Sequence, residues 1–321
     1  MSETKYFPTV EAIEKAAQVL DEILEPTPFQ RNANLSDIYD AEVYLKREDL
    51  QMVRSYKIRG AYNKIRTIDP ELVKNGIVCA SAGNHAQGVA FSCSKLKIMG
   101  SIFMPVTTPK QKIEQVRMFG KEFIEIILTG DTFDAANSAA IAYAEQNAKT
   151  FIPPFDDPKV MEGQGTIGRE ILSQCKEALD YIFVPIGGGG LASGLGAYIS
   201  QMSPSTKIIG VEPGGAPCMK AAIENGAPIK LENIDKFVDG AAVQLAGKHT
   251  YEVCRQVLND IVVVPEGAVC TTIIHMYNKS AIVVEPAGAL AVAALKFYKD
   301  EIKGKRVACV VSGSNNDITR M

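Results

Sequence analysis

The chain has 321 residues, of which 46% are hydrophobic and 22% charged, with a formal net charge of −3. This composition is typical of a folded globular protein and excludes a disordered or collagen-like chain, and the length allows about two domains. The weak charge, with no basic arm and no block of like charge, excludes nucleic acid as an expected partner.

The chain reads as that of a cytoplasmic protein without membrane segments. Its seven cysteines are scattered and never spaced as Cys-x-x-Cys, which indicates reduced thiols rather than disulfides or a structural metal. The first twenty residues include acids and no apolar core, so no signal peptide is predicted. Residues 181–206 carry no charge, but a proline, four glycines and a polar end favour a strand, a glycine loop and a helix over a membrane span.

Short apolar runs alternate with helical periodicity along the whole chain. In chain order, strands are predicted over residues 42–46, 77–80, 101–104, 122–128, 181–186, 207–212, 261–264 and 306–311. Helices are predicted over residues 9–24, 57–67, 84–97, from Pro109 onward, 131–146 with Asp131 as N-cap, 191–202, 216–225, 251–258, 267–277 and 287–299. This alternation predicts an α/β fold with mostly parallel sheets buried on both faces.

Ligands of such folds bind at the carboxyl ends of the strands. Four turns after predicted strands carry unusual residues: SAGNH (81–85), GGGGL (187–191), EPGGA (212–216) and SGSN (312–315). We expect all four to lie along one edge of the sheet and to form the functional site.

The glycine turn is predicted to bind a phosphate. Four consecutive glycines (Gly187, Gly188, Gly189 and Gly190) leave the backbone N–H groups accessible before a helix N-terminus, which attracts anions. A flexible turn with no ligand is the alternative. A nicotinamide-dependent oxidoreductase is another, because Gly187, Gly189 and Ala192 fit a relaxed dinucleotide fingerprint and Glu212 ends the next strand. A second glycine pattern, at 163–168, follows no strand and is expected to be helical.

Lys57 lies at a predicted helix start, next to an aromatic residue. A cation there opposes the helix dipole, which lowers the cost of losing its charge, as a lysine that forms Schiff bases requires. A solvated surface lysine is the alternative reading. Asn84 and His85 could present amides and side chains to an anion or a ring hydroxyl, and Ser312 could hydrogen-bond a heterocycle nitrogen; helix caps are the alternative for all three.

Five segments taken together resemble one known family. SYKIRGA (55–61), SAGNH, GGGGL, EPAGA (285–289) and SGSN occur in the order found in the pyridoxal-phosphate enzymes of the tryptophan-synthase-β fold, specifically the threonine dehydratases. The resemblance extends from residue 25 to the end of the chain. It implies two open, twisted sheets with helices on both faces and the cofactor in the cleft between a large domain (1–52 and 149–321) and a small one (53–148).

The resemblance also implies roles for individual residues. Lys57 would bind pyridoxal 5′-phosphate covalently and act as the catalytic base, Asn84 would bond the ring hydroxyl, and Ser312 would face the ring nitrogen. The cofactor phosphate would be held by Gly187, Gly188, Gly189, Gly190 and Leu191. The substrate carboxylate would be held by the segment Ser81, Ala82, Gly83, Asn84 and His85.

The implied reaction is β-elimination of L-threonine to 2-oxobutyrate and ammonia, and of L-serine to pyruvate, by a homodimer or homotetramer. Serine racemases are the alternative within the fold, but they have a serine where Ala82 stands. They also place a divalent cation with a glutamate and an aspartate, whereas Cys218 accompanies Glu212 here, so no metal site is expected. Family members with an isoleucine-sensing domain continue beyond this chain, so activity without isoleucine inhibition is expected.

Overall fold

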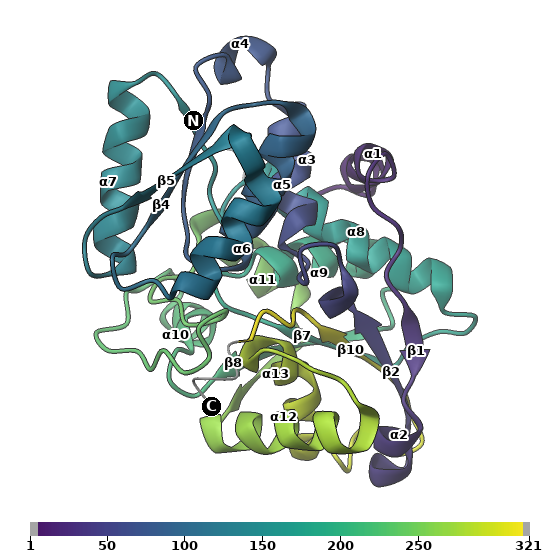
Figure 1. The fold of residues 1–321 in the computed structure, drawn as a ribbon. Coiled ribbons are helices and arrows are strands. Elements are labelled where there is room, and N and C mark those ends of the chain that lie inside the picture. The colour runs from purple at the N-terminus through teal and green to yellow at the C-terminus, as the bar shows by residue number, and fades with distance from the viewer. Residues whose placement is uncertain (1–5, 317–321) are drawn as a thin grey trace.

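Two open, twisted sheets form the frame of the protein (Figure 1). The computed structural model describes residues 6–316. In spatial order, the larger sheet contains β1 (Phe29–Arg31), β2 (Glu42–Arg47), β10 (Arg306–Val311), β7 (Tyr181–Pro185), β8 (Lys207–Pro213) and β9 (Asp260–Val264). The smaller contains β5 (Ile124–Leu128), β4 (Gly100–Met104), β3 (Ile77–Ala80) and β6 (Thr150–Phe151). Among these strands only β1 and β2 pair antiparallel, so the predicted fold class is confirmed.

Helices connect nearly all of the strands. They are α1 (Val10–Leu20), α2 (Ala33–Tyr39), α3 (Lys57–Thr67), α4 (Pro70–Val73), α5 (Asn84–Leu96), α6 (Lys110–Gly120), α7 (Phe133–Gln146), α8 (Pro158–Gln174), α9 (Gly190–Met202), α10 (Cys218–Asn225), α11 (Lys248–Val257), α12 (Glu266–Ser280) and α13 (Pro286–Ala294). Short 3₁₀ turns are η1 (Glu48–Leu50), η2 (Lys121–Phe123) and η3 (Leu295–Phe297).

The apolar strands are buried on both faces, as their sequences require. Along β10, Val307, Cys309 and Val311 pack toward α12 and α13, whereas Ala308 and Val310 pack toward α9 and α11. Successive side chains of a strand point to opposite faces, so a strand between two helical layers must be apolar throughout. The smaller sheet is covered in the same way by α5 and α6 on one face and α7 on the other.

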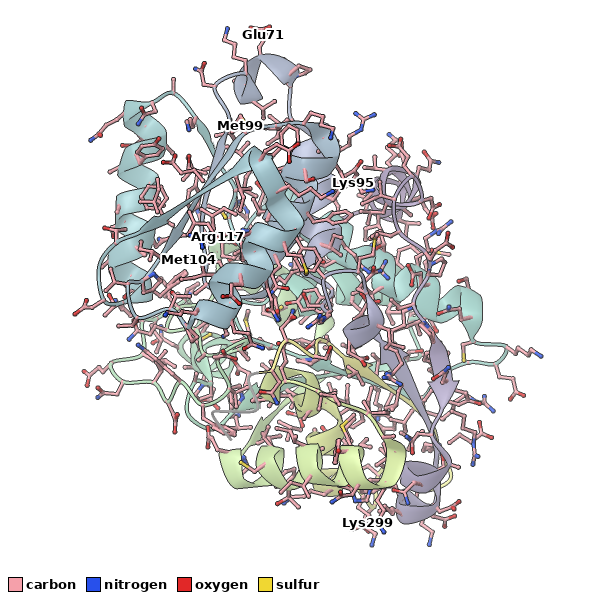
Figure 2. The ribbon with its side chains drawn as sticks, viewed as in Figure 1. Glu71, Lys95, Met99, Met104, Arg117 and Lys299 are labelled. Atoms are coloured by element: carbon pink, nitrogen blue, oxygen red, sulfur yellow. The ribbon has the colours of Figure 1, made fainter. Side chains whose placement is uncertain are left out.

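The two sheets lie in different halves of the molecule, with α8 and α9 between them (Figure 1). Glu71, near the smaller sheet, and Lys299, below the larger one, mark opposite ends (Figure 2). The helical layer between the sheets is closely packed, because a Cβ added at Gly163 of α8 would lie 2.7 Å from the carbonyl oxygen of Arg59 in α3. The glycine pattern at 163–168 therefore serves helix packing, and its prediction as a helix is confirmed.

Three predictions from the sequence are corrected by the structure. The first helix ends at Leu20 rather than at residue 24. Thr132, not Asp131, caps α7, because its Oγ1 accepts a hydrogen bond from the Ala135 N–H at 3.2 Å. The four unusual turns do not share one sheet edge: residues 81–85 follow β3 of the smaller sheet, and the other three turns follow strands of the larger sheet.

The division into a large and a small domain remains a proposal. The proposed boundary, at which the chain returns from the small to the large domain, lies between residues 148 and 149. This is just before β6, which pairs with β3 of the smaller sheet. Among the described residues, no helix has both the length and the apolarity needed to cross a membrane. Residues 1–5 and 317–321 lie outside the described part of the chain.

Candidate active site

The segment that carries Lys57 is fixed to the turn that follows β10. Ser55 forms an antiparallel bridge with Gly313, and the Tyr56 N–H donates to the carbonyl oxygen of Ser312 at 3.2 Å. Lys57 is the first residue of α3 and therefore begins its helix beside Ser312. Lys57 and Ser312, which are 255 positions apart in the sequence, are thus brought close together. Only the family resemblance had placed them in one site, because Lys57 does not follow the end of a strand.

The amine of Lys57 is directed into the interior rather than into solvent. Its Nζ donates to the carbonyl oxygen of Pro154 at 2.8 Å and lies 5.5 Å from the centre of the Tyr56 ring. Burial lowers the pKa of Lys57 to about 8, and the nearby carboxylate of Glu285 only partly opposes this. The reading of Lys57 as a solvated surface lysine is therefore wrong.

The lowered pKa predicts how Lys57 reacts in the protein without cofactor. A neutral amine attacks an aldehyde, so the rate of capture of pyridoxal at Lys57 should rise with pH, with its midpoint near the pKa of about 8. Stopped-flow absorption across a pH series measures this. A midpoint near 10.5, the ordinary pKa of a lysine, would contradict the burial of the amine.

The glycine turn joins β7 to α9 and presents unused N–H groups. Gly189 has φ +96°, which L-residues rarely adopt. Within the described part of the chain, the N–H groups of Gly188, Gly189 and Gly190 donate no hydrogen bond. Side chains at these positions would collide with their surroundings, since a Cβ at Gly188 would lie 2.4 Å from the Phe155 ring. The turn therefore has the properties of an anion cradle at a helix N-terminus.

Gly189→Ala is expected to weaken binding of pyridoxal 5′-phosphate by about tenfold or more, because the backbone of the cradle must change to accept a Cβ. Gly226→Ala is the matched control. Gly226 also has a positive φ (+80°), but nothing lies within 4 Å of a Cβ added there. Cofactor titration of the two apoproteins should separate the variants, and equal affinities would show that the glycine turn does not bind the cofactor.

The turn after β3 opens α5 without a side-chain cap. Gly83 occupies the N-cap position, and Ser81 Oγ accepts its N–H at 3.2 Å. A Cβ added at Gly83 would meet nothing within 4 Å, so space lies before this helix N-terminus. His85 is buried, and burial followed by the charge of Lys57 lowers its pKa to about 3. The neutral ring donates from Nε2 to the Ile152 carbonyl oxygen at 3.0 Å.

Asn84 links the two sheets across the site. Its Nδ2 donates to Oε1 of Glu285 at 2.6 Å, and its Oδ1 accepts from Nδ2 of Asn315 at 2.7 Å. Glu285 is buried, and burial followed by the charge of Asp239 raises its pKa to about 7. The turn at 81–85 is therefore tied to the turn at 312–315, although they follow strands of different sheets.

A segment that sequence reasoning missed connects these parts. Residues 152–155 supply the Ile152 carbonyl to His85, the Pro154 carbonyl to Lys57, and the Phe155 ring that lies against Gly188. Two prolines and an aromatic residue after the short strand β6 were the available signal. Because two of these three contacts use backbone carbonyls, residue types alone could not reveal them.

Glu212 is not free to bind a ribose. It is fully buried, and its two oxygens accept the N–H groups of Met219 at 2.7 Å and Lys220 at 2.8 Å. Burial raises its pKa to about 7. The dinucleotide alternative thus loses its acidic residue. Within residues 6–316, no group of three histidine, cysteine or acidic side chains is arranged to hold a metal.

Comparison with known proteins identifies the class. The sequence pattern of the family described as pyridoxal-phosphate dependent enzyme matches residues 20–313. The chain is 57% identical over 312 residues to the biosynthetic L-threonine dehydratase of Halalkalibacterium halodurans, covering 97% of this chain and 75% of that protein. It is 56% identical over 312 residues to the Bacillus subtilis protein of the same name, covering 97% and 74%.

Solved structures of related enzymes have the same fold as this chain. The processed form of threonine deaminase isoform 2 from Solanum lycopersicum superposes with a TM-score of 0.91 at 37% identity, over 100% of this chain and 94% of that one. Maize serine racemase superposes with a TM-score of 0.93 at 29% identity, over 98% and 96%. The chain therefore belongs to the pyridoxal-phosphate-dependent enzymes and, within them, to the threonine dehydratase family.

The residues present fit the cofactor. The cradle of unused N–H groups suits its phosphate, and the buried amine of Lys57 suits its aldehyde. Ser312 is 3% exposed and lies beside the start of the Lys57 helix, where its hydroxyl would be able to serve a ring nitrogen. The assignment of Lys57, Asn84, Ser312 and the glycine turn to the cofactor remains a proposal.

Proposed function

We propose that this chain converts L-threonine to 2-oxobutyrate and ammonia, and L-serine to pyruvate and ammonia, with pyridoxal 5′-phosphate as cofactor. The observation that carries the proposal is the placement of the Lys57 amine. It lies beside Ser312 and contacts the segment that covers the glycine turn. The names of the relatives, which are threonine dehydratases at 56–57% identity, support the choice of substrate.

The cofactor, when bound, supplies an electron sink that makes the α-proton of the amino acid removable and its β-hydroxyl a leaving group. The protein supplies the proton transfers and the orientation. Lys57, with its pKa near 8, is neutral often enough at physiological pH for its Nζ to take the α-proton. The Pro154 carbonyl oxygen holds that nitrogen in place by accepting a hydrogen bond from it at 2.8 Å.

The α5 N-terminus would bind the substrate carboxylate. Helix N-termini attract anions, and the turn at 81–85 leaves its N-cap without a side-chain bond and with open space beside Gly83. His85, whose pKa burial lowers to about 3, is neutral at physiological pH, so the backbone N–H groups and the helix dipole carry the attraction for the carboxylate. At position 82 an alanine offers no proton donor, so we propose that racemisation is slow relative to elimination.

Steady-state assays with the cofactor-loaded protein test the proposal. L-Threonine should give 2-oxobutyrate and ammonia in equal amounts, L-serine should give pyruvate, and D-serine should form from L-serine far more slowly than pyruvate does. A protein that binds the cofactor yet releases no ammonia from either amino acid would contradict it. Formation of D-serine faster than pyruvate would instead support a racemase.

We also propose that the protein is cytoplasmic and works as a homo-oligomer. All seven cysteines are free thiols, which favours a reducing compartment. Ile274, Tyr277 and Val283 are each more than half exposed, and such an apolar face favours contact with a second copy. Sedimentation velocity should show a dimer or tetramer, which Ile274→Glu should weaken.

A further inference from the structure

The glycine turn is held in place through its carbonyl groups. The carbonyl oxygen of Gly187 accepts from the Cys218 thiol at 3.3 Å, and that of Gly188 accepts from the Thr250 hydroxyl at 2.6 Å. In a trans peptide the C=O of one residue and the N–H of the next point in opposite directions. Fixing the Gly188 carbonyl therefore also fixes the direction of the N–H of Gly189.

A turn made only of glycines needs such an outside support. Glycine residues rotate through most of φ/ψ space without steric cost, so nothing within the turn prevents a peptide from flipping. Within residues 6–316, the only other hydrogen bond to the Gly188 carbonyl comes from the Gly247 N–H, at a long 3.4 Å. The hydroxyl of Thr250 is thus the strong contact that selects one orientation of this peptide.

Thr250 is itself rigidly placed. It is fully buried in the first turn of α11. Asp156 holds that turn: its Oδ1 accepts the N–H groups of His249 at 2.8 Å and Thr250 at 3.1 Å. Threonine in a helix usually donates to a carbonyl of its own helix, and that option exists here at Gly247, 3.3 Å away. The shorter of its two hydrogen bonds, at 2.6 Å, instead goes to the Gly188 carbonyl of the glycine turn.

We propose that Thr250 is a positioning residue for the phosphate of the cofactor, acting through the Gly188–Gly189 peptide. This inference rests on the proposed function, since it requires that the turn binds the phosphate. The hydroxyl does not touch the anion. It keeps the N–H of Gly189 directed to where the anion binds, so its removal should weaken binding of the phosphate and leave binding of the aldehyde and ring unchanged.

The test compares Thr250→Val, which removes the hydroxyl at nearly constant volume, with Thr250→Ser, which keeps it. Dissociation constants of each apoprotein are measured for pyridoxal 5′-phosphate and for pyridoxal, which lacks the phosphate. For Thr250→Val we expect about tenfold weaker binding of the phosphate form, the size of one buried hydrogen bond, and binding of pyridoxal within twofold of wild type. Thr250→Ser should restore binding of the phosphate form to within about threefold.

Several results would overturn the inference: unchanged preference for the phosphate form in Thr250→Val, equal loss of both ligands, or a serine variant as weak as the valine one. Should Thr250→Val not fold, Thr250→Ala carries the same expectations. If the wild-type protein binds neither ligand at Lys57, both the proposed function and this inference are contradicted. If the wild-type protein prefers the phosphate form and Thr250→Val keeps that preference, only this inference is contradicted.

Discussion

Lys57→Ala is expected to lower kcat with L-threonine by about 10³-fold, because the variant loses both the amine that binds the cofactor aldehyde and the base that takes the substrate proton. The variant should fold, since it removes an amine whose charge burial already disfavours. Its absorption spectrum with cofactor should be that of the free aldehyde.

Lys74→Ala is the control for this loss. Lys74 is exposed and forms an ion pair of 2.8 Å with Glu71, three residues earlier on the short helix α4. Its replacement should leave kcat within about twofold, because exposed ion pairs contribute little. A Lys57→Ala protein with more than a tenth of wild-type kcat would mean that another residue performs the proton transfer.

Arg59→Met is expected to destabilise the protein by about 3–5 kcal/mol, because it leaves two buried carboxylates with one cation between them. The Arg59 guanidinium is 1% exposed and binds Glu48 through two contacts of 2.8 Å and Glu170 through contacts of 2.6 and 3.0 Å. Lys46, also buried, pairs with Glu170 at 2.5 Å. These four residues join α3 to β2, η1 and α8, and so fix the helix that begins with Lys57.

Arg66→Met on the same helix is the matched control. Arg66 lies 3.8 Å from Glu22, and both side chains are about half exposed, so its loss should cost about 0–1 kcal/mol. Urea unfolding of the apoproteins measures both values. A loss below about 1 kcal/mol for Arg59→Met would show that the network contributes no more than an exposed pair.

The cost of Arg59→Met should also depend on pH. Burial alone would raise the pKa of Glu170, but Arg59 and then Lys46 outweigh it and hold the pKa below its usual value. That contribution to stability is present above the unfolded pKa and is lost as the pH falls. Without Arg59, burial has the larger effect on the pKa of Glu170. Protonation of Glu170 in acid therefore removes part of the unfavourable free energy of its buried charge in the variant. The difference in unfolding free energy should therefore be smaller in acid than at neutral pH.

The strands between two helical layers could be predicted because their burial on both faces leaves an unbroken apolar run. β3, β7 and β10 were predicted to within one residue for this reason. β1 and β6 were missed. β1 is an edge strand with exposed residues, and β6 is two residues long. Both are strands only because they pair with β2 or β3, and the local sequence pattern does not reveal this pairing.

The residues of the candidate site also differ in whether a local sequence pattern reveals them. Asn84, Ser312 and the glycine turn were predicted as site residues because their residue types are unusual in turns after strands. Lys57 was assigned only through the family resemblance, and the roles of all of them toward the cofactor remain proposals. Thr250 was missed because its contact is with a carbonyl 62 positions away. The EPAGA segment assigns no role to Glu285, since its partner Asn84 begins α5, which follows a strand of the other sheet. Contacts of this kind follow from how the sheets pack and from no spacing along the chain.

The covalent attachment of the cofactor tests the account most directly. The cofactor-loaded protein is treated with sodium borohydride, which fixes the linkage, and is then digested and mapped by mass spectrometry. We predict a phosphopyridoxyl group on the peptide that contains Lys57 and on no other. Labelling of a different lysine, or no labelling of a protein that is active on L-threonine, would contradict the assignment of Lys57.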